Sequence, residues 1–183
     1  DYATCIKTHV DRKIEVIYNG YDPRDFPKPK SKNTEDFLIT YTGELSEDRI
    51  PHALLRALSR LEDSNIKLQF IGNTCPELKQ EIQQLNLGNK VILKPYMPHI
   101  ASIAELQQSD LLLLVINQVA NGKGIVPGKI FEYLGTRKPI LCLGDPTGEA
   151  GEIIKTTNSG FCIAHHNEEE IFILLSRLSS GVL

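Results

Sequence analysis

The chain has 183 residues, enough for one ordinary domain with a single continuous core. Hydrophobic residues make up 41%, charged residues 23%, and the formal net charge is −3, which is the balance of a soluble globular protein. The basic residues are scattered, which argues against a nucleic-acid partner, and the longest apolar run, residues 111–116, is too short to span a bilayer.

Cysteine usage and the chain start indicate the cellular context. The four cysteines form no Cys-x-x-Cys pair and no cluster with histidine, so no metal site is expected and reduced thiols in a cytoplasmic protein are favoured: Cys5, Cys75, Cys142 and Cys162. The chain starts at Asp1 and its only methionine is Met97. We therefore expect a processed chain or, more simply, a fragment of a longer protein.

Short aliphatic or β-branched runs alternate with amphipathic stretches along the chain. The runs predict strands at residues 14–18, 37–41, 67–71, 91–94, 111–116, 139–143 and 161–163. Helical patterns lie between them at residues 51–61, 76–86, 100–109, 128–134, 149–156 and 168–178. Residues 22–33, rich in proline and lysine, predict an exposed linker. Residues 1–36 are thus interpreted as an interdomain segment with a linker, and residues 37–183 as the folded domain.

This alternation predicts the fold class. Strand–helix–strand order repeated five or six times implies parallel strands with crossover helices, an open doubly wound α/β sheet. We expect a Rossmann-like three-layer α/β/α sandwich. Ligands of such sheets bind at the carboxyl ends of the strands, so the loops after Tyr41, Lys94 and Ile116 are the candidate site.

The loops after Tyr41 and Ile116 suit an anion. Gly43 follows the first of these strands directly and permits a sharp turn with close ligand approach, and Arg49 precedes a helix start where it could hold a phosphate. The other loop is rich in glycine and opens a helix near Gly128, whose free N–H groups favour an anion. Lys129 opposes the helix dipole there. It shares a face with Glu132, so the alternative is an ordinary intrahelical ion pair.

The run GIVPGKIFEYLGTRKPIL, residues 124–141, resembles the donor-site segment of retaining glycosyltransferases of group 1, which have the GT-B fold. In that family a helix glutamate binds the ribose of the nucleotide, and Glu132 matches it. The resemblance also implies that the preceding backbone contacts diphosphate and sugar, here Gly124, Ile125 and Val126. Two shorter matches follow family order: VIYNGYD, residues 16–22, resembles the turn into the C-terminal domain, and residues 37–58 resemble its first strand, loop and helix.

The loop after Lys94 falls where this family holds the nucleobase, so Tyr96 and Met97 are expected to contact the base; a proline-stiffened turn with a core tyrosine is the alternative. Two departures from the family pattern stand out. Gly124 occupies the position of an acidic residue that touches the donor sugar, and Glu44 replaces a basic residue. Sugar recognition is therefore expected to differ, through backbone N–H groups. Lys129 resembles a lysine in a subset of the family and is expected to contact phosphate.

These observations predict the donor-binding half of a GT-B glycosyltransferase in polysaccharide or glycoconjugate biosynthesis, with UDP-sugar or GDP-sugar as substrate and without a metal cofactor. The acceptor domain would lie N-terminal to this chain, and membrane association would be peripheral and confined to the full-length enzyme. No catalytic residue is assigned. The alternatives are half of a sugar-nucleotide epimerase or phosphorylase, and a non-catalytic α/β ligand-binding or interaction module.

Overall fold

The computed structural model describes residues 12–13, 15–28, 32, 34–61 and 64–181. From residue 37 onward, strands and helices alternate. Their order is β1 Phe37–Thr42, α2 His52–Ser59, β2 Ile66–Ile71, α3 Pro76–Gln84, β3 Val91–Lys94, α4 His99–Gln108, β4 Leu111–Val115, α5 Lys129–Thr136, β5 Ile140–Leu143, α6 Glu149–Thr156, β6 Gly160–Ile163 and α7 Glu168–Ser179. Three short 3-10 turns add to these: η1 Pro23–Asp25, η2 Glu47–Arg49 and η3 Gly122–Gly124.

All strand pairs are parallel, and the six strands have the order β3-β2-β1-β4-β5-β6. The chain builds outward from β1 to β3 on one side, then crosses back to place β4 against β1, where Ile39 pairs with Leu111. The loops that leave β1 and β4 therefore diverge. This arrangement confirms the Rossmann-like fold predicted from the sequence, and the divergence marks the point where such sheets bind ligands.

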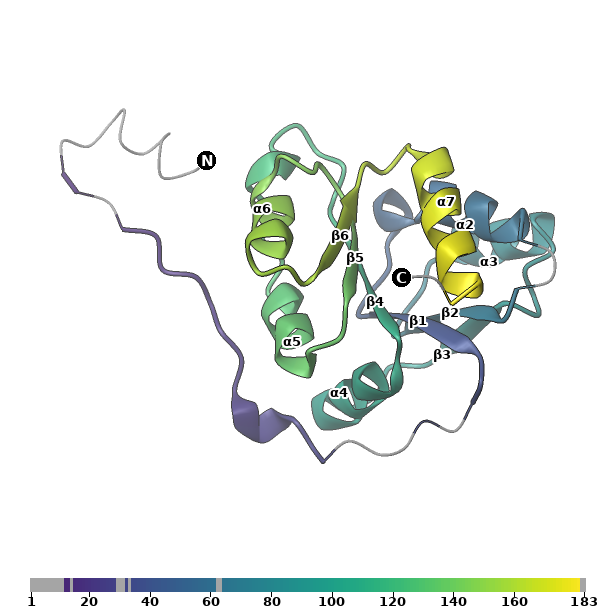
Figure 1. Cartoon of the computed structure of the whole chain (residues 1–183), viewed down its shortest axis with the longest axis horizontal. Coiled ribbons are helices and arrows are strands. Elements are labelled where there is room, and N and C mark those ends of the chain that lie inside the picture. The colour runs from purple at the N-terminus through teal and green to yellow at the C-terminus, as the bar shows by residue number, and fades with distance from the viewer. Residues whose placement is uncertain (1–11, 14, 29–31, 33, 62–63, 182–183) are drawn as a thin grey trace.

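Helices cover both faces of the sheet, which gives three layers (Figure 1). The helices α2, α3 and α7 pack on one face, over β4 residues such as Leu111 and Leu113. On the other face, α5 and α6 pack over Leu112 and Leu114, together with Leu106 of α4. All four leucines of β4 are fully buried, because a central strand covered on both faces has no solvent side. Among the described residues, no helix is long and apolar enough to cross a membrane.

The segment before β1 differs from its prediction. A strand was expected at residues 14–18, but residues 15–18 belong to no strand and Ile17 is 90% exposed. Val-Ile-Tyr has high β propensity, yet a strand needs a neighbour to pair with. The predicted exposed linker is also only partly exposed: Phe26 is half-buried and lies against Gly135 of α5.

The described cysteines are free thiols, as the sequence predicts. Cys142 is buried, while Cys75 and Cys162 are half-buried. Cys5 lies outside the described residues. Cys142 and Cys162 are paired across β5 and β6, and the hydrogen bond between the two thiols, together with burial, raises the pKa of Cys142.

Candidate functional site

A cavity of about 450 Å³ opens at the carboxyl edge of the sheet. Four segments form it: the loops after β1 and β2, the connection from β3 to α4, and the first turn of α5. Its lining residues are Thr42, Gly43, Glu44, Ile71, Gly72, Asn73, Tyr96, Met97, His99, Ser102, Lys129 and Glu132. The volume lies within the range of small-molecule sites, and the position is the one that open parallel sheets use.

Two glycines let the first two loops close on each other. Gly43 and Gly72 have φ of 113° and 128°, a conformation that favours glycine. A Cβ at Gly72 would lie 2.4 Å from the carbonyl oxygen of Gly43, so no side chain fits between the loops. Beyond the glycines, the amide of Leu45 donates to the carbonyl of Asn73 at 2.9 Å. Where the two loops meet, the floor of the cavity is therefore formed by the backbone of Gly43 and Gly72, which a ligand can approach closely.

Lys129 supplies a cation beside this floor. Its Nζ donates to the carbonyl oxygen of Thr42 at 2.7 Å and lies 4.2 Å from the centre of the Tyr41 ring. Burial and, to a smaller extent, the nearby charge of Arg49 lower the pKa of Lys129 to about 8. The helix dipole also disfavours a cation in the first turn. A bound anion would relieve all three penalties, which makes this corner a candidate phosphate site.

Arg49 lies near enough to Lys129 to act on its charge but does not line the cavity. It ends η2, and its Nε donates to Ser46 Oγ at 3.0 Å. Its charge acts on both Lys129 and Tyr41, and the hydroxyl of Tyr41 donates to the carbonyl of Glu44 at 2.9 Å. Burial is the largest influence on the pKa of Tyr41 and raises it, although the charge of Arg49 acts in the opposite direction. Arg49 thus contributes a positive field to the corner without a direct place in the lining.

Glu132 lies one turn along α5 from Lys129. Its Oε1 accepts from His99 Nε2 at 3.1 Å, and the other ring nitrogen of His99 lies 3.9 Å from Asp25 Oδ2. His99 is the first residue of α4. The intrahelical Lys129–Glu132 pair that the sequence left open is replaced by separate partners, Thr42 and His99. Both charges remain on the same face and open onto the cavity.

The connection from β3 to α4 brings Tyr96 and Met97 into the lining of the cavity. Tyr96 is 76% exposed, so the alternative of a core tyrosine is wrong. An exposed aromatic ring with an adjacent thioether offers a flat apolar surface of the kind on which a nucleobase stacks.

Tyr133 holds α5, and hence Lys129 and Glu132, against the sheet. Its side chain is fully buried. The hydroxyl accepts from the amide of Thr42 at 3.2 Å and donates to the carbonyl of Leu113 at 3.3 Å, so it joins the end of β1 to the middle of β4. Burial raises the pKa of Tyr133, which keeps the phenol protonated.

We expect Tyr133→Phe to lower the free energy of unfolding by about 1–2 kcal/mol, because the buried amide of Thr42 loses a partner. Urea denaturation followed by circular dichroism measures this change. Tyr96→Phe, at an exposed ring, is the matched control and should unfold at the wild-type midpoint. Equal midpoints for the wild type and both variants would contradict the role assigned to the Tyr133 hydroxyl.

The cavity brings together five of the ten predicted site residues, namely Gly43, Tyr96, Met97, Lys129 and Glu132. The other five lie outside its lining, namely Arg49, Gly124, Ile125, Val126 and Gly128. The amides of Gly124 and Ile125 bond within the η3 turn, to the carbonyls of Asn121 and Gly122. Lys123 of this turn is tied to Asp145 at 3.1 Å, which holds the turn against the loop after β5.

Sequence reasoning missed the contribution of the loop after β2 and of the start of α4. Gly72 and Asn73 follow β2 directly, and a glycine after a strand is the same signal that identified Gly43. Because β2 lies between β1 and β3, its loop has to line any site that the other two loops share. His99 and Ser102 carried no such signal, because their position depends on where α4 begins.

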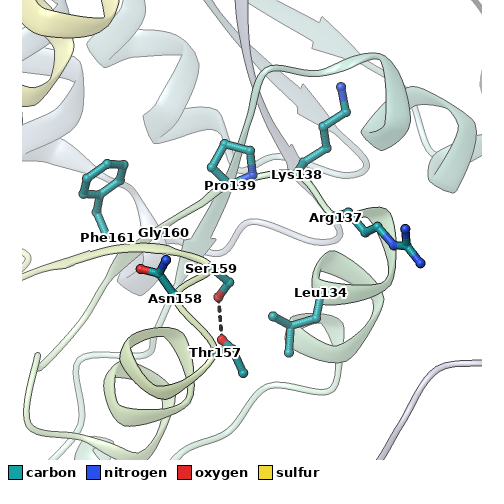
Figure 2. A pocket seen from close by; sticks show the side chains of 9 residues that line it. All are labelled: Leu134, Arg137, Lys138, Pro139, Thr157, Asn158, Ser159, Gly160 and Phe161. Carbon is teal, nitrogen blue, oxygen red and sulfur yellow. Dashed lines mark hydrogen bonds between the residues drawn. The ribbon is translucent and has the colours of Figure 1, made fainter. Parts of the chain in front are cut away.

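A second cavity, of about 550 Å³, lies at the opposite edge of the sheet, beside the amino ends of β5 and β6. Figure 2 shows Thr157 and Ser159 joined by a hydrogen bond of 2.8 Å, with the charged ends of Arg137 and Lys138 pointing away from them. The carboxyl ends of α5 and α6 meet here, and their carbonyls disfavour an anion. The cavity at the carboxyl edge is therefore the better candidate for a phosphate-bearing ligand.

The sequence of residues 22–180 matches the family described as glycosyl transferases group 1. The chain belongs to this family. No curated protein matches it significantly in sequence.

Solved structures with a similar fold include Anabaena HepE in complex with UDP and glucose, with 20% identity and a TM-score of 0.67 over 91% of this chain and 48% of HepE. The C-terminal domain of the Francisella tularensis glycosyl transferase LpcC has 15% identity and a TM-score of 0.65, covering 88% of both chains. A putative UDP-N-acetylglucosamine 2-epimerase from Listeria monocytogenes has 18% identity and a TM-score of 0.60, over 84% of this chain and 41% of the epimerase. This chain thus spans about half the length of HepE, and its fold is the one found in GT-B glycosyltransferases.

Proposed function

We propose that this domain binds a nucleoside-diphosphate sugar and forms the donor half of a glycosyltransferase. The observation that carries the proposal is that Lys129 and Glu132 lie on one turn of α5 and both line the cavity. A cation for a diphosphate and a carboxylate for a ribose then lie on the same face of one helix. Family membership supports the same ligand class.

The proposal includes a direction for the ligand along the lining. The base stacks near Tyr96 and Met97, the ribose hydroxyls donate to Glu132, and the diphosphate lies between Lys129 and the backbone at Gly43. Positive charge comes from Lys129 and from the nearby Arg49, so protein groups rather than a metal would bind the diphosphate. HepE was solved with UDP, which makes UDP the first nucleotide to test and GDP the second.

The catalytic contribution of this half would be charge stabilisation of the leaving group. When the glycosyl bond breaks, the diphosphate gains negative charge, and a cation already fixed beside it lowers that cost. The acceptor would bind to a second domain, with the reaction in the cleft between the two, in polysaccharide or glycoconjugate assembly. The chain alone is then expected to bind donor weakly and to transfer no sugar.

Calorimetric titration with UDP and GDP tests the proposal. The wild type should bind at least one of them, and Glu132→Ala should weaken that binding by about 10-fold, because a carboxylate that accepts from the ribose contributes ~1.5 kcal/mol. Glu152→Ala, an exposed glutamate on α6, is the control of equal charge and should bind as the wild type does.

If Glu132→Ala bound the nucleotides as tightly as the wild type, the assignment of Glu132 to the ribose would be wrong. A thermal shift screen over nucleoside diphosphates separates the donor-binding function from a non-catalytic interaction module, since a ligand that binds only the folded state raises the melting temperature. No stabilisation by any nucleoside diphosphate would favour the interaction module.

A further inference from the structure

The segment before β1 lies along α5 (Figure 1). We call residues 18–27 the strap. Its aromatic side chains Tyr21 and Phe26 pack edge to face, with ring centres 5.2 Å apart, over Gly135. A Cβ at Gly135 would come within 2.5 Å of Phe26 and 2.9 Å of Tyr21, so the absence of a side chain there creates the space that the strap fills. At its other end, Tyr18 donates to Glu149 of α6 at 3.0 Å.

The strap carries a short turn that brings a carboxylate near His99. Asp22 starts the turn by accepting from the amide of Arg24 at 2.9 Å, and η1 ends at Asp25. Asp25 Oδ2 then lies 3.9 Å from Nδ1 of His99, whose Nε2 lies 3.1 Å from Glu132. The histidine ring therefore stands between a carboxylate of the strap and the carboxylate assigned to the ribose.

A glutamate at the mouth of an open cavity has several rotamers available, and a ligand must select one of them. The side chain of Glu132 is 36% exposed, so burial alone does not fix it. Because an ionised carboxylate only accepts, His99 Nε2 has to carry the proton and donate. One oxygen of Glu132 is thereby held towards α4, and the other is available for ribose hydroxyls.

We propose that His99 is a positioning residue that orients Glu132 for the ribose, and that the strap supports His99 from its other side. The inference rests on the proposed function, since it needs Glu132 to bind the ribose. It predicts that the gain in affinity from the ribose hydroxyls depends on a residue 33 positions away in sequence, and on the path of the segment that leads into the domain.

The test compares UDP with 2′,3′-dideoxy-UDP, which lacks the hydroxyls. In the wild type, UDP should bind more tightly than the dideoxy compound. His99→Ala should reduce this preference by about 5-fold while leaving affinity for the dideoxy compound nearly unchanged. His99→Gln, which keeps an N–H donor, should recover part of the preference. In a Glu132→Ala background, His99→Ala should have no further effect on the preference.

An equal loss of affinity for both nucleotides in His99→Ala would mean that His99 contacts the ligand directly or only maintains the fold, and the inference would be wrong. Additive losses in the double variant with Glu132→Ala would also overturn it. If the wild type itself fails to prefer UDP, or Glu132→Ala keeps the preference, the failure lies in the proposed ribose site instead.

Phe26→Ala tests the contribution of the strap, because it removes the aromatic anchor of the η1 turn without touching the cavity. The preference for UDP should fall by about 2-fold in this variant. In a His99→Ala background, Phe26→Ala should not lower the preference further. A preference equal to that of the wild type would overturn the support assigned to the strap. Circular dichroism confirms in each case that the variant is folded.

Discussion

Lys129→Met is expected to weaken UDP binding by about 50-fold and to stabilise the unliganded domain. The loss of affinity follows from the removal of a cation beside the diphosphate, where a charge-assisted hydrogen bond contributes ~2–3 kcal/mol. The gain in stability follows from burial, because the folded protein lowers the pKa of Lys129 to about 8 from 10.5. Part of this penalty is screened by solvent, so we expect a gain of about 1–2 kcal/mol at pH 7.

The sign of the pH dependence follows from the lowered pKa of Lys129. Below pH 8, folded and unfolded chains both hold the proton, and the folded chain carries the full penalty. Between pH 8 and 10.5 the folded chain releases the proton while the unfolded chain keeps it, so the contribution of Lys129 to stability increases as pH rises. The penalty disappears above the unfolded pKa.

Urea denaturation at pH 7, 8 and 9 and calorimetry with UDP at the same values measure both effects. The wild-type free energy of unfolding should increase with pH relative to Lys129→Met, while wild-type affinity for UDP should decrease as the free lysine loses its charge. Lys155→Met, at an exposed position on α6, is the control and should follow the wild type in both. If Lys129→Met bound UDP as tightly as the wild type does, a contact between Lys129 and the diphosphate would be ruled out.

Gly160→Ala is expected to destabilise the domain by about 3 kcal/mol or more, a large part of the stability of an ordinary domain. Gly160 begins β6 with φ of 152°, and it pairs with Ile140 of β5. A Cβ at this position would lie 2.0 Å from the carbonyl oxygen of Ile140 and 2.5 Å from its nitrogen. The backbone atoms of Ile140 are held in the β5–β6 ladder and cannot move aside as a flexible side chain can.

Thermal and urea denaturation of Gly160→Ala measure the loss. Gly88→Ala is the matched control, because a Cβ there meets no atom within 4 Å. Gly88→Ala should unfold within about 0.5 kcal/mol of the wild type, as surface substitutions usually do. Wild-type stability in Gly160→Ala would show that β5 and β6 are paired differently from the register described above.

The sequence predicted the domain core because its patterns are local. The strands β4 and β5 are short runs of mostly aliphatic residues that the sheet buries on both faces, and each helix has one apolar side. The prediction failed at residues 15–18, where a similar composition occurs without a neighbouring strand among the described residues. Strand propensity describes a residue's suitability for a sheet, whereas pairing requires a neighbour that only the fold supplies.

The candidate site was predictable in part for the same reason. Lys129 and Glu132 lie on one helix turn, so their shared face follows from spacing. The partners that change their chemistry come from elsewhere: Thr42 lies 87 positions from Lys129, and His99 lies 33 positions from Glu132. Contacts of this kind depend on the register of the sheet and on where α4 begins, and neither was available from local patterns.

The exposure of Tyr96 has a practical consequence for spectroscopy. The chain contains 6 tyrosines and no tryptophan, so its ultraviolet emission comes from tyrosine without energy transfer to an indole. Tyr96 lines the cavity with 76% of its surface open to water, whereas Tyr41 and Tyr133 are fully buried. A nucleobase stacked on Tyr96 would quench that ring and leave the interior ones unaffected. If the base binds as proposed, the emission of Tyr96 would report ligand occupancy without a label.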